Sequence, residues 1–254
     1  MNAAKALVRN AFARAAGGYD AAAEFQRAAG RQLLAGMPFD ASPARILDAG
    51  CGTGHGLSLL HRRWPAARIV PLDFAFAMVG QVERGACRLC GDVEALPLAS
   101  QSMDFYWSNL TLQWCDAASF MREAARVLKP GAKLAVSTLG PATFNELRSA
   151  FSGVDRYRHT IEFCDVTALT AALAAAGLRI RELKRAPSVL HYPELATLLA
   201  AVRKLGANRV TGANRRHGLM GKAEWARFAA QYERLRTASG LPLGYDAIFV
   251  YAEK

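Results

Sequence analysis

The 254-residue sequence has no apolar run long enough to cross a bilayer. The longest such stretch, from Ala168 to Leu178, is rich in alanine and far shorter than the ~20 residues that a membrane-spanning helix needs. We therefore expect no transmembrane segment and no membrane partner. The first 18 residues hold three basic residues and no acidic one, which suits a transit peptide or, better, an ordinary amphipathic helix.

Cysteine is scarce, and its spacing excludes two common uses. The five cysteines include one C-x-x-C, formed by Cys87 and Cys90, with no second pair to complete a four-ligand zinc site. An odd number without paired spacing also argues against a secreted disulfide framework. We expect a reduced, cytoplasmic protein without bound metal, in which Cys87 and Cys90 are half-buried strand residues.

Acidic residues are outnumbered, 21 against 32 Lys plus Arg, so the formal net charge is +11. None occurs from Leu195 to Ala223, a stretch whose positive charges come from Arg203, Lys204, Arg209, Arg215, Arg216 and Lys222. Charge of one sign favours an acidic partner but does not by itself choose among nucleic acid, membrane and protein. The sequence lacks a base-flipping motif, an RNA-binding module and an aromatic-interleaved basic stretch, which disfavours nucleic acid.

Apolar runs of strand length alternate with helical patterns from about Ala44 to Leu139, and this predicts crossover units that build a parallel sheet. The predicted strands are Ile46 to Ala49, Ile69 to Leu72, Cys87 to Cys90, Phe105 to Leu110 and Leu134 to Thr138. A helix over Phe120 to Leu128 should stop at Lys129-Pro130-Gly131, before the fifth strand.

The second half of the chain continues this plan with one interruption. A helix is expected over Asp165 to Ala176, and an alternating run from Leu178 to Tyr192 predicts a strand near the sheet edge. Two helical patterns then precede a last strand, Tyr245 to Tyr251, expected to be antiparallel. The predicted fold is a doubly wound, Rossmann-like α/β sheet of seven strands. Its parts are an N-terminal helical lid (1–40), the core (41–192 and 241–254) and a helical cap insertion (193–240).

A glycine-rich turn, Gly50-Cys51-Gly52-Thr53-Gly54, directly follows the first strand and opens a helix. Glycine lets a backbone approach a ligand closely, but dinucleotide-binding dehydrogenases use a related turn. Asp48 discriminates, because a carboxylate beside the turn repels a pyrophosphate and attracts a cationic ligand. The pattern favours S-adenosylmethionine, which carries an ammonium and a sulfonium.

Acidic residues also follow the second and third predicted strands. Asp73 stands where a carboxylate can accept hydrogen bonds from a ribose diol, and Asp92 and Val93 where an adenine amino group would lie. Phe74 and Met78 supply apolar neighbours for the ring. Each acid alone could be a helix cap, but three acids at successive strand ends indicate one ligand site.

These residues, with Asn109 at the fourth strand end and Leu128-Lys129-Pro130-Gly131, resemble the class I S-adenosylmethionine-dependent methyltransferases. Asn109 would lie over the methionine part of the cofactor, although it could also be a turn residue. A narrower resemblance, to the malonyl-acyl-carrier-protein O-methyltransferases of biotin synthesis, spans nearly the whole chain. Its segments are Tyr19 to Gln26, Ser108 to Asp116, Ser137 to Leu147, Gly206 to Val210 and Gly240 to Tyr251.

This resemblance implies methyl transfer to the free carboxylate of a malonyl thioester on an acidic acyl-carrier protein, with S-adenosylhomocysteine as the other product. It implies a monomer, with Tyr19 and Gln26 at the cofactor. Tyr19, His159 and Arg209 are candidates for orienting the malonyl group, although Tyr19 could equally anchor the core. The alternatives are a methyltransferase for a free small-molecule acid or other metabolite and a non-catalytic binding protein of the same fold.

Overall fold

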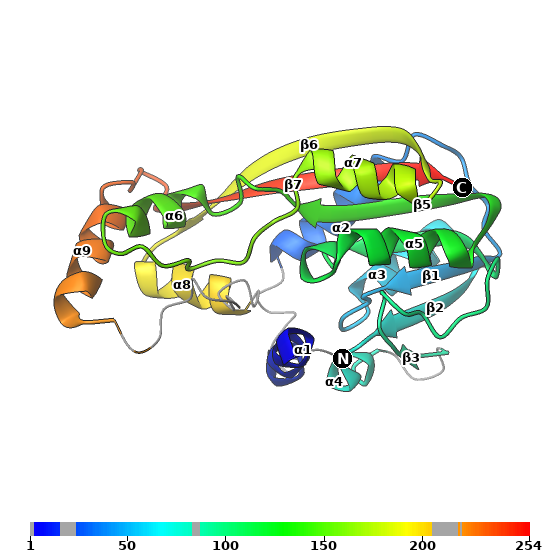
Figure 1. Ribbon diagram of the computed structural model, residues 1–254, viewed down its shortest axis with the longest axis horizontal. Helices are drawn as coiled ribbons and strands as arrows, with labels where there is room; N and C mark the ends of the chain where they lie inside the picture. Colours follow the sequence, from blue (N-terminus) through cyan, green and yellow to red (C-terminus); the bar gives the residue numbers. More distant parts are fainter. Residues whose placement is uncertain (1–2, 16–23, 83–86, 205–217, 219) are drawn as a thin grey trace.

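The computed structural model describes residues 3–15, 24–82, 87–204, 218 and 220–254. Tyr19 and Arg209, two of the predicted site residues, lie outside these ranges. Within them one seven-stranded sheet runs in the order β3-β2-β1-β4-β5-β7-β6 (Figure 1). The strands are β1 (Arg45–Ala49), β2 (Arg68–Asp73), β3 (Leu89–Cys90), β4 (Met103–Asn109), β5 (Leu128–Leu139), β6 (Arg179–Tyr192) and β7 (Leu241–Glu253).

Every strand pair is parallel except those that involve β7, which runs antiparallel to both β5 and β6. This sheet, with its antiparallel last strand, confirms the predicted fold. β6 lies at one edge and contributes no fully buried residue, as its alternating charged sequence indicated. The other edge is β3, which is only two residues long because the chain turns away at Gly91.

Helices cover both faces of the sheet, because successive strand side chains point to opposite sides. Ile46 and Phe105 face one core cluster, and their neighbours Leu47 and Tyr106 face the other. The first face packs against α2 (Glu24–Ala35) and α3 (His55–Arg63), and the second against α5 (Ala117–Val127) and α7 (Val166–Ala175) (Figure 1).

The helix predicted to end at Lys129-Pro130-Gly131 stops earlier, at Val127. Those three residues form the irregular start of β5, where the pairing with β4 shifts register between Met103 and Phe105. Pro130 is tolerated there because an irregular strand start spares its missing N–H. Gly131 takes a positive φ of 75°. Pro130 and Gly131, predicted to lie in a loop after the helix, are therefore part of strand β5.

Beyond the carboxyl ends of the parallel strands lie α6 (Asn145–Ser152), α8 (Leu195–Lys204) and α9 (Lys222–Glu233) (Figure 1). The last two occur between β6 and β7, within the predicted cap. Leu198 of α8 and Phe228 of α9 are fully buried in the same cluster as the sheet. The cap region thus packs directly onto the extended β6–β7 ribbon.

Two helices lie near the β3 edge, α1 (Ala3–Ala15) and the short α4 (Phe76–Val79) (Figure 1). Cys87 and Cys90 are both exposed there, so the expectation that they are half-buried was wrong. Cys90 ends the two-residue strand β3 at the sheet edge, and Cys87 lies before it, outside the sheet. Among the described residues, no helix has both the length and the apolar character needed to span a membrane.

Candidate cofactor pocket

A hollow of about 680 Å³, part of it open to solvent, lies over the carboxyl ends of β1, β2 and β4. Eight predicted cofactor residues line it: Gly50, Gly52, Asp73, Phe74, Met78, Asp92, Val93 and Asn109. Eight residues that the sequence reading did not assign line it as well: Lys5, Val8, Phe12, Glu94, Leu110, Thr111, Trp114 and Cys115.

The glycine turn leaves β1 with positive φ angles that favour glycine: 77° at Gly50, 54° at Gly52 and 100° at Gly54. A Cβ on Gly50 would lie 2.0 Å from Oγ1 of Thr111, so glycine is required there for packing as well. A Cβ on Gly52 would meet no protein atom within 4 Å. Gly52 therefore leaves open space on the pocket wall, and this space suits a ligand that touches the backbone.

Asp73 ties the second strand end to the glycine turn. Its Oδ2 accepts a hydrogen bond from the Gly52 N–H (3.0 Å), and its Oδ1 accepts one from the Ala75 N–H (2.9 Å). Burial raises the pKa of the Asp73 carboxyl above its ordinary value, and these backbone donors oppose the rise. The result is a rigidly held carboxylate that faces the pocket and would be stabilised by a donor or a positive charge on a ligand.

Asp48 lies beneath the pocket and does not line it. The residue is 2% exposed, and its Oδ2 has no hydrogen-bond partner among the described residues. A Cβ at Gly56 of α3 would lie 2.8 Å from that oxygen, so the helix start packs directly on the carboxyl group. Burial, assisted by the charge of Asp73, raises the pKa of Asp48 to about 7. Asp48 can thus act on a ligand through its charge but not by direct contact.

Asp92 and Glu94 form the acidic side of the pocket, just after β3. Nζ of Lys5, from α1, lies 2.6 Å from Oδ2 of Asp92 and 2.9 Å from Oε2 of Glu94. Asp92 Oδ1 accepts from the Glu94 N–H, so its second oxygen is the one that Lys5 uses. A ligand donor that binds this oxygen competes with the Lys5 ammonium for it.

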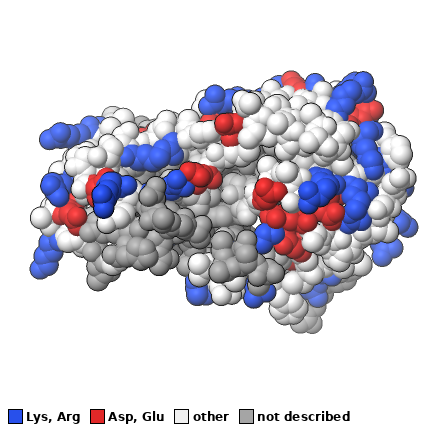
Figure 2. Space-filling view, viewed as in Figure 1, with Lys and Arg blue, Asp and Glu red and all other residues white. Residues whose placement is uncertain are grey.

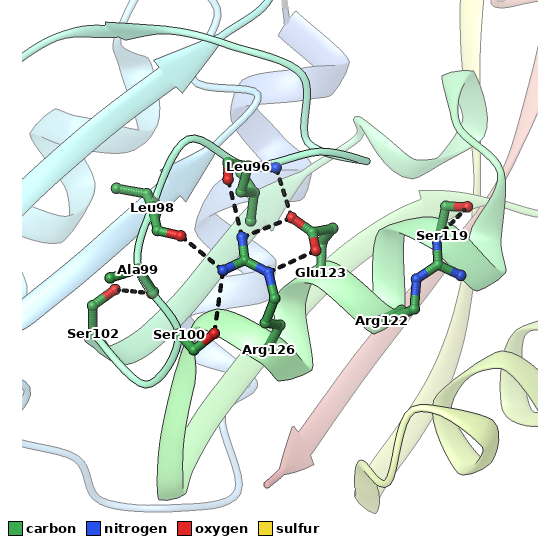
Figure 3. A network of polar contacts seen from close by, with 9 residues as sticks. All are labelled: Leu96, Leu98, Ala99, Ser100, Ser102, Ser119, Arg122, Glu123 and Arg126. Carbon is green, nitrogen blue, oxygen red and sulfur yellow. Dashed lines mark hydrogen bonds and ion pairs between the residues drawn. The ribbon is translucent and has the colours of Figure 1, made fainter.

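The loop that carries these two acids is fixed to α5 by a network around Arg126 (Figure 3). Arg126 donates to the backbone oxygens of Leu96 and Leu98 and to both carboxylate oxygens of Glu123. Glu123 in turn accepts from the Leu96 N–H at 2.7 Å. The guanidinium therefore closes the loop against a helix, so Asp92 and Glu94 have a defined position even though β3 is short.

Asn109 links the fourth strand end to α2. Its Nδ2 donates to the backbone oxygen of Gln26 (3.0 Å), and its Oδ1 accepts from the Ser137 hydroxyl (2.7 Å). Gln26 does not line the pocket, but its side-chain Oε1 is buried and has no hydrogen-bond partner among the described residues. A buried acceptor without a partner is uncommon, so this oxygen marks Gln26 as a residue that packing alone does not account for.

The apolar wall comes from α1 and from the turn after β4. Phe12 meets Trp114 edge to face, with ring centroids 5.6 Å apart and planes at 86°. Lys5, Val8 and Phe12 lie on one face of α1, at spacings of three and four residues. This stripe was the available signal for a pocket-lining helix, but spacing alone does not say what a helix covers.

His159, predicted to orient the malonyl group, does not line this pocket. Its ring stacks on Phe151, with centroids 3.4 Å apart, and its Nε2 lies 2.9 Å from Oδ1 of Asp155. Phe151 stacks in turn on Phe228 of α9 (4.0 Å). These contacts hold His159 in a second hollow near the end of α6, apart from the cofactor pocket, and its role in orienting the malonyl group stays a prediction.

The basic residues predicted for the cap are only partly described. Arg203 in α8 and Lys222 at the start of α9 are exposed. Arg209, Arg215 and Arg216 lie outside the described residues, as does the side chain of Lys204.

The pocket chemistry fits S-adenosylmethionine. The carboxylates of Asp73, Asp92 and Glu94 suit a ligand with donors and positive charge, and Phe12, Phe74 and Trp114 supply flat apolar surfaces for a ring. The open space at Gly52 leaves room for such a ligand. The buried oxygen of Asp48, which has no partner among the described residues, also favours a cationic ligand, because a positive charge above it would stabilise the ionised acid. A pyrophosphate would meet like charge here.

The chain resembles known methyltransferases in sequence and in structure. The methyltransferase domain model matches residues 47–136. Malonyl-(acyl-carrier protein) O-methyltransferase of Dechloromonas aromatica (strain RCB) is 46% identical over 250 residues, which cover 98% of this chain and 95% of that protein. The biotin biosynthesis bifunctional protein BioHC of Cellvibrio japonicus (strain Ueda107) is 37% identical over 97% of this chain and 49% of that protein.

Solved structures agree on the fold. Geranyl diphosphate C-methyltransferase of Streptomyces coelicolor, solved with Mg²⁺, geranyl diphosphate and S-adenosyl-L-homocysteine, superposes with a TM-score of 0.54 at 15% identity. The match covers 89% of this chain and 78% of that one, and this level of identity supports the fold alone. From its sequence relatives over nearly the whole length, the chain belongs to the family of malonyl-acyl-carrier-protein O-methyltransferases within the methyltransferase-domain proteins.

Proposed function

We propose that the protein transfers a methyl group from S-adenosylmethionine to the free carboxylate of a malonyl thioester carried by acyl-carrier protein. The product is the malonyl methyl ester that enters biotin synthesis. The observation that carries this proposal is the 46% identity, over 98% of the chain, to a protein named for this reaction. The acid-lined pocket at the carboxyl edge of the sheet supports it independently, because its charge suits a cationic methyl donor.

For the donor, each pocket residue has a role that follows from its position. Asp73 accepts from the ribose hydroxyls, and Asp92 accepts from the adenine amino group once Lys5 has moved away. Phe74, Met78 and Val93 pack against the ring. Gly50 and Gly52 admit the donor to backbone contact, while Asn109 and Gln26 bound its methionine end. Asp48 favours the positive charge from below.

S-adenosylmethionine supplies an electrophilic methyl group bonded to a sulfonium. The malonyl carboxyl group, with a pKa near ~4, is already ionised at neutral pH, so the reaction requires no general base. The protein's contribution is to hold the attacking oxygen in line with the methyl group and to exclude water. Trp114, Phe12 and Leu110 provide the apolar enclosure for this on the described side of the site. Tyr19 and Arg209 are the proposed malonyl contacts.

Mass spectrometry of malonyl carrier protein incubated with enzyme and S-adenosylmethionine tests the proposal directly. We expect one added methyl group on the malonyl moiety, and none with the Asp73→Asn variant at limiting donor. Methylation of free dicarboxylic acids but not of the carrier-bound malonyl group would instead establish a small-molecule methyltransferase. No methyl transfer to either, combined with no donor binding by calorimetry, would leave a binding protein of the same fold.

A further inference from the structure

The second hollow, near the carboxyl end of α6, is lined by basic side chains and has no role in the reaction derived above. It measures about 620 Å³, much of it open to solvent. Three arginines, Arg148, Arg156 and Arg158, line it against a single acidic residue, Asp155. The acid faces inward, because Asp155 lies 2.9 Å from the His159 ring and accepts from the Tyr157 N–H. The excess positive charge is therefore presented to solvent.

Each arginine retains positive charge to offer. Arg148 donates to three neutral oxygens, those of Pro141, Thr143 and the Asn145 side chain, and forms no ion pair with a described residue, although the charge of Glu146 acts on it. Arg156 is exposed and forms no ion pair with any residue in the described ranges. Arg158 pairs with Glu162, whose side chain is 76% exposed. Such an exposed ion pair is weak, so a carboxylate of a docked partner can replace Glu162.

The hollow is also firmly built, unlike a loop with scattered surface arginines. The stack His159–Phe151–Phe228 fixes residues 155–160 to both α6 and α9. Two exposed aromatic residues border this end of the protein, Tyr157 at 36% and Trp225 at 46% exposure. Exposed aromatics beside arginines are typical of protein-binding surfaces. We define these residues (Arg148, Arg156, Tyr157, Arg158 and Trp225) as the α6–α9 surface.

Its position suits docking of a substrate carrier. The elements α6 and α9 lie beyond the carboxyl ends of the parallel strands, the side on which the cofactor pocket opens (Figure 1). Figure 2 shows Lys and Arg side chains, with fewer Asp and Glu among them, over this end of the molecule, while a cluster of Asp and Glu bordered by Lys and Arg lies over its other half. A carrier protein with acidic side chains would be attracted to the first region and repelled by the acidic cluster.

We propose that the α6–α9 surface docks the acyl-carrier protein, with the arginine hollow receiving acidic side chains of the carrier's surface. This inference rests on the proposed function for the identity of the partner. Guanidinium groups suit it, because each can hold a carboxylate through two parallel N–H donors. The surface sets the affinity and orientation of the carrier, while the cofactor pocket sets the chemistry.

Steady-state kinetics of charge-reversal variants test the docking surface. In Arg156→Glu/Arg158→Glu we expect the KM for malonyl carrier protein to rise about 10-fold with little change in kcat, as for a rim of steering charges. The matched control is Arg179→Glu/Arg181→Glu, which makes the same charge change at the start of β6, where both residues are exposed and face Glu253. In the control we expect a KM within about 2-fold of the wild-type value.

Three further measurements keep the inference separable from the proposed function. A malonyl thioester of N-acetylcysteamine has no carrier protein, so its kcat/KM should be equal in both double variants and the wild type. Carrier protein without its thiol arm should inhibit the wild type competitively and the Arg156/Arg158 variant about 10-fold less, since its acidic surface is intact. Glu162→Gln, which frees Arg158, should lower the carrier KM.

The outcomes divide clearly. If wild-type enzyme does not methylate malonyl carrier protein, the proposed function fails. If it does, but both double variants show the same KM, the docking surface is elsewhere. Loss of activity toward the small thioester as well would mean that the arginines stabilise the fold, and failure of the armless carrier to compete would assign the hollow to the arm rather than to the carrier's acidic surface. Each of the last three results overturns the inference.

Discussion

The cofactor pocket and the α6–α9 surface both lie toward the carboxyl ends of the parallel strands. They differ in the sign of their charge and in the burial of the charged side chains. Asp73 in the pocket and Asp48 beneath it are buried, and the N–H groups of Gly52 and Ala75 fix Asp73. On the α6–α9 surface, Arg156 and Arg158 are solvent-accessible, and only the aromatic stack beneath them is buried.

This difference has energetic consequences. Charges held in low dielectric by fixed donors respond strongly to a ligand of opposite charge and weakly to salt. Exposed arginines contribute ~1 kcal/mol or less per pair and are screened by salt. We therefore expect the pocket to control donor affinity and its pH dependence, and the α6–α9 surface to control carrier encounter and its salt dependence. The following predictions test that separation.

The largest expected effect concerns Asp48 and pH. Its pKa is raised to about 7, so the folded protein holds a proton on Asp48 that the unfolded chain releases near pH 4. The folded state binds more protons in this window, so the free energy of unfolding should fall as pH rises from about 4 to 7, by up to about 4 kcal/mol. Above pH 7 the Asp48 carboxyl is ionised in both the folded and the unfolded state, so the free energy of unfolding should not fall further on its account.

Asp48→Asn should remove this fall, which urea unfolding at pH 5 and pH 8 without donor will measure. The control is Asp104→Asn, because Asp104 is a carboxylate of strand β4 whose pKa is lowered. Burial alone would raise this pKa, but the hydrogen bonds from Lys129 and from the Arg45 N–H lower it. The control should keep the fall with pH. An unchanged slope in Asp48→Asn would mean that another buried acid carries the proton.

Asp73→Asn should weaken S-adenosylmethionine binding by about 100-fold, since hydrogen bonds to a charged group contribute roughly 1.5–3 kcal/mol. The amide also places an N–H donor against the donors of Gly52 or Ala75 and loosens the turn. Calorimetry measures the affinity, and Asp104→Asn again serves as the control. The KM for malonyl carrier protein should not change at saturating donor. A comparable rise in that KM would show that the two regions are coupled.

The regions also differ in how well the sequence predicted them. The glycine turn and the acids Asp48, Asp73 and Asp92 occur at or just after the ends of successive strands. Ligands of parallel sheets bind at the carboxyl ends of the strands, so local sequence patterns were enough to predict that most of these residues share one site. Asp48 was the exception in detail, because a side chain inside a strand points to one face or the other, and here it points beneath the turn.

Long-range packing decided what the sequence did not. The sequence placed His159 among arginines but did not show that its ring stacks on Phe151, which stacks in turn on Phe228 of another helix. Lys5 contacts Asp92 because α1 folds back over the β3 edge, and no local pattern fixes that position. Such contacts depend on tertiary packing between distant segments, whereas strands and turns depend on near neighbours.

Gly52→Ala separates backbone strain from ligand contact. Gly52 and Gly131 both have positive φ, and a Cβ at either meets no protein atom within 4 Å, so each substitution should cost the same ~1–2 kcal/mol of stability. Only Gly52 lines the pocket, so only Gly52→Ala should also weaken donor binding, by roughly 30-fold through crowding of the ligand. Thermal unfolding and calorimetry on both variants measure the two effects. Equal donor affinity in both would remove the backbone contact from the proposed site.

The smallest predicted effect concerns the ammonium that occupies the acidic side of the pocket. Lys5 contacts both Asp92 and Glu94, and a ligand amino group that needs the same Asp92 oxygen must displace it. Lys5→Met keeps the length of the side chain and removes the competitor, so S-adenosylmethionine should bind about 3-fold more tightly, in line with the small energy of a partly exposed pair. Arg9→Met, on an exposed position one turn along α1, should have no effect. Weaker binding in Lys5→Met would mean that the contact holds α1 closed over the donor, and that Asp92 binds the lid rather than the adenine.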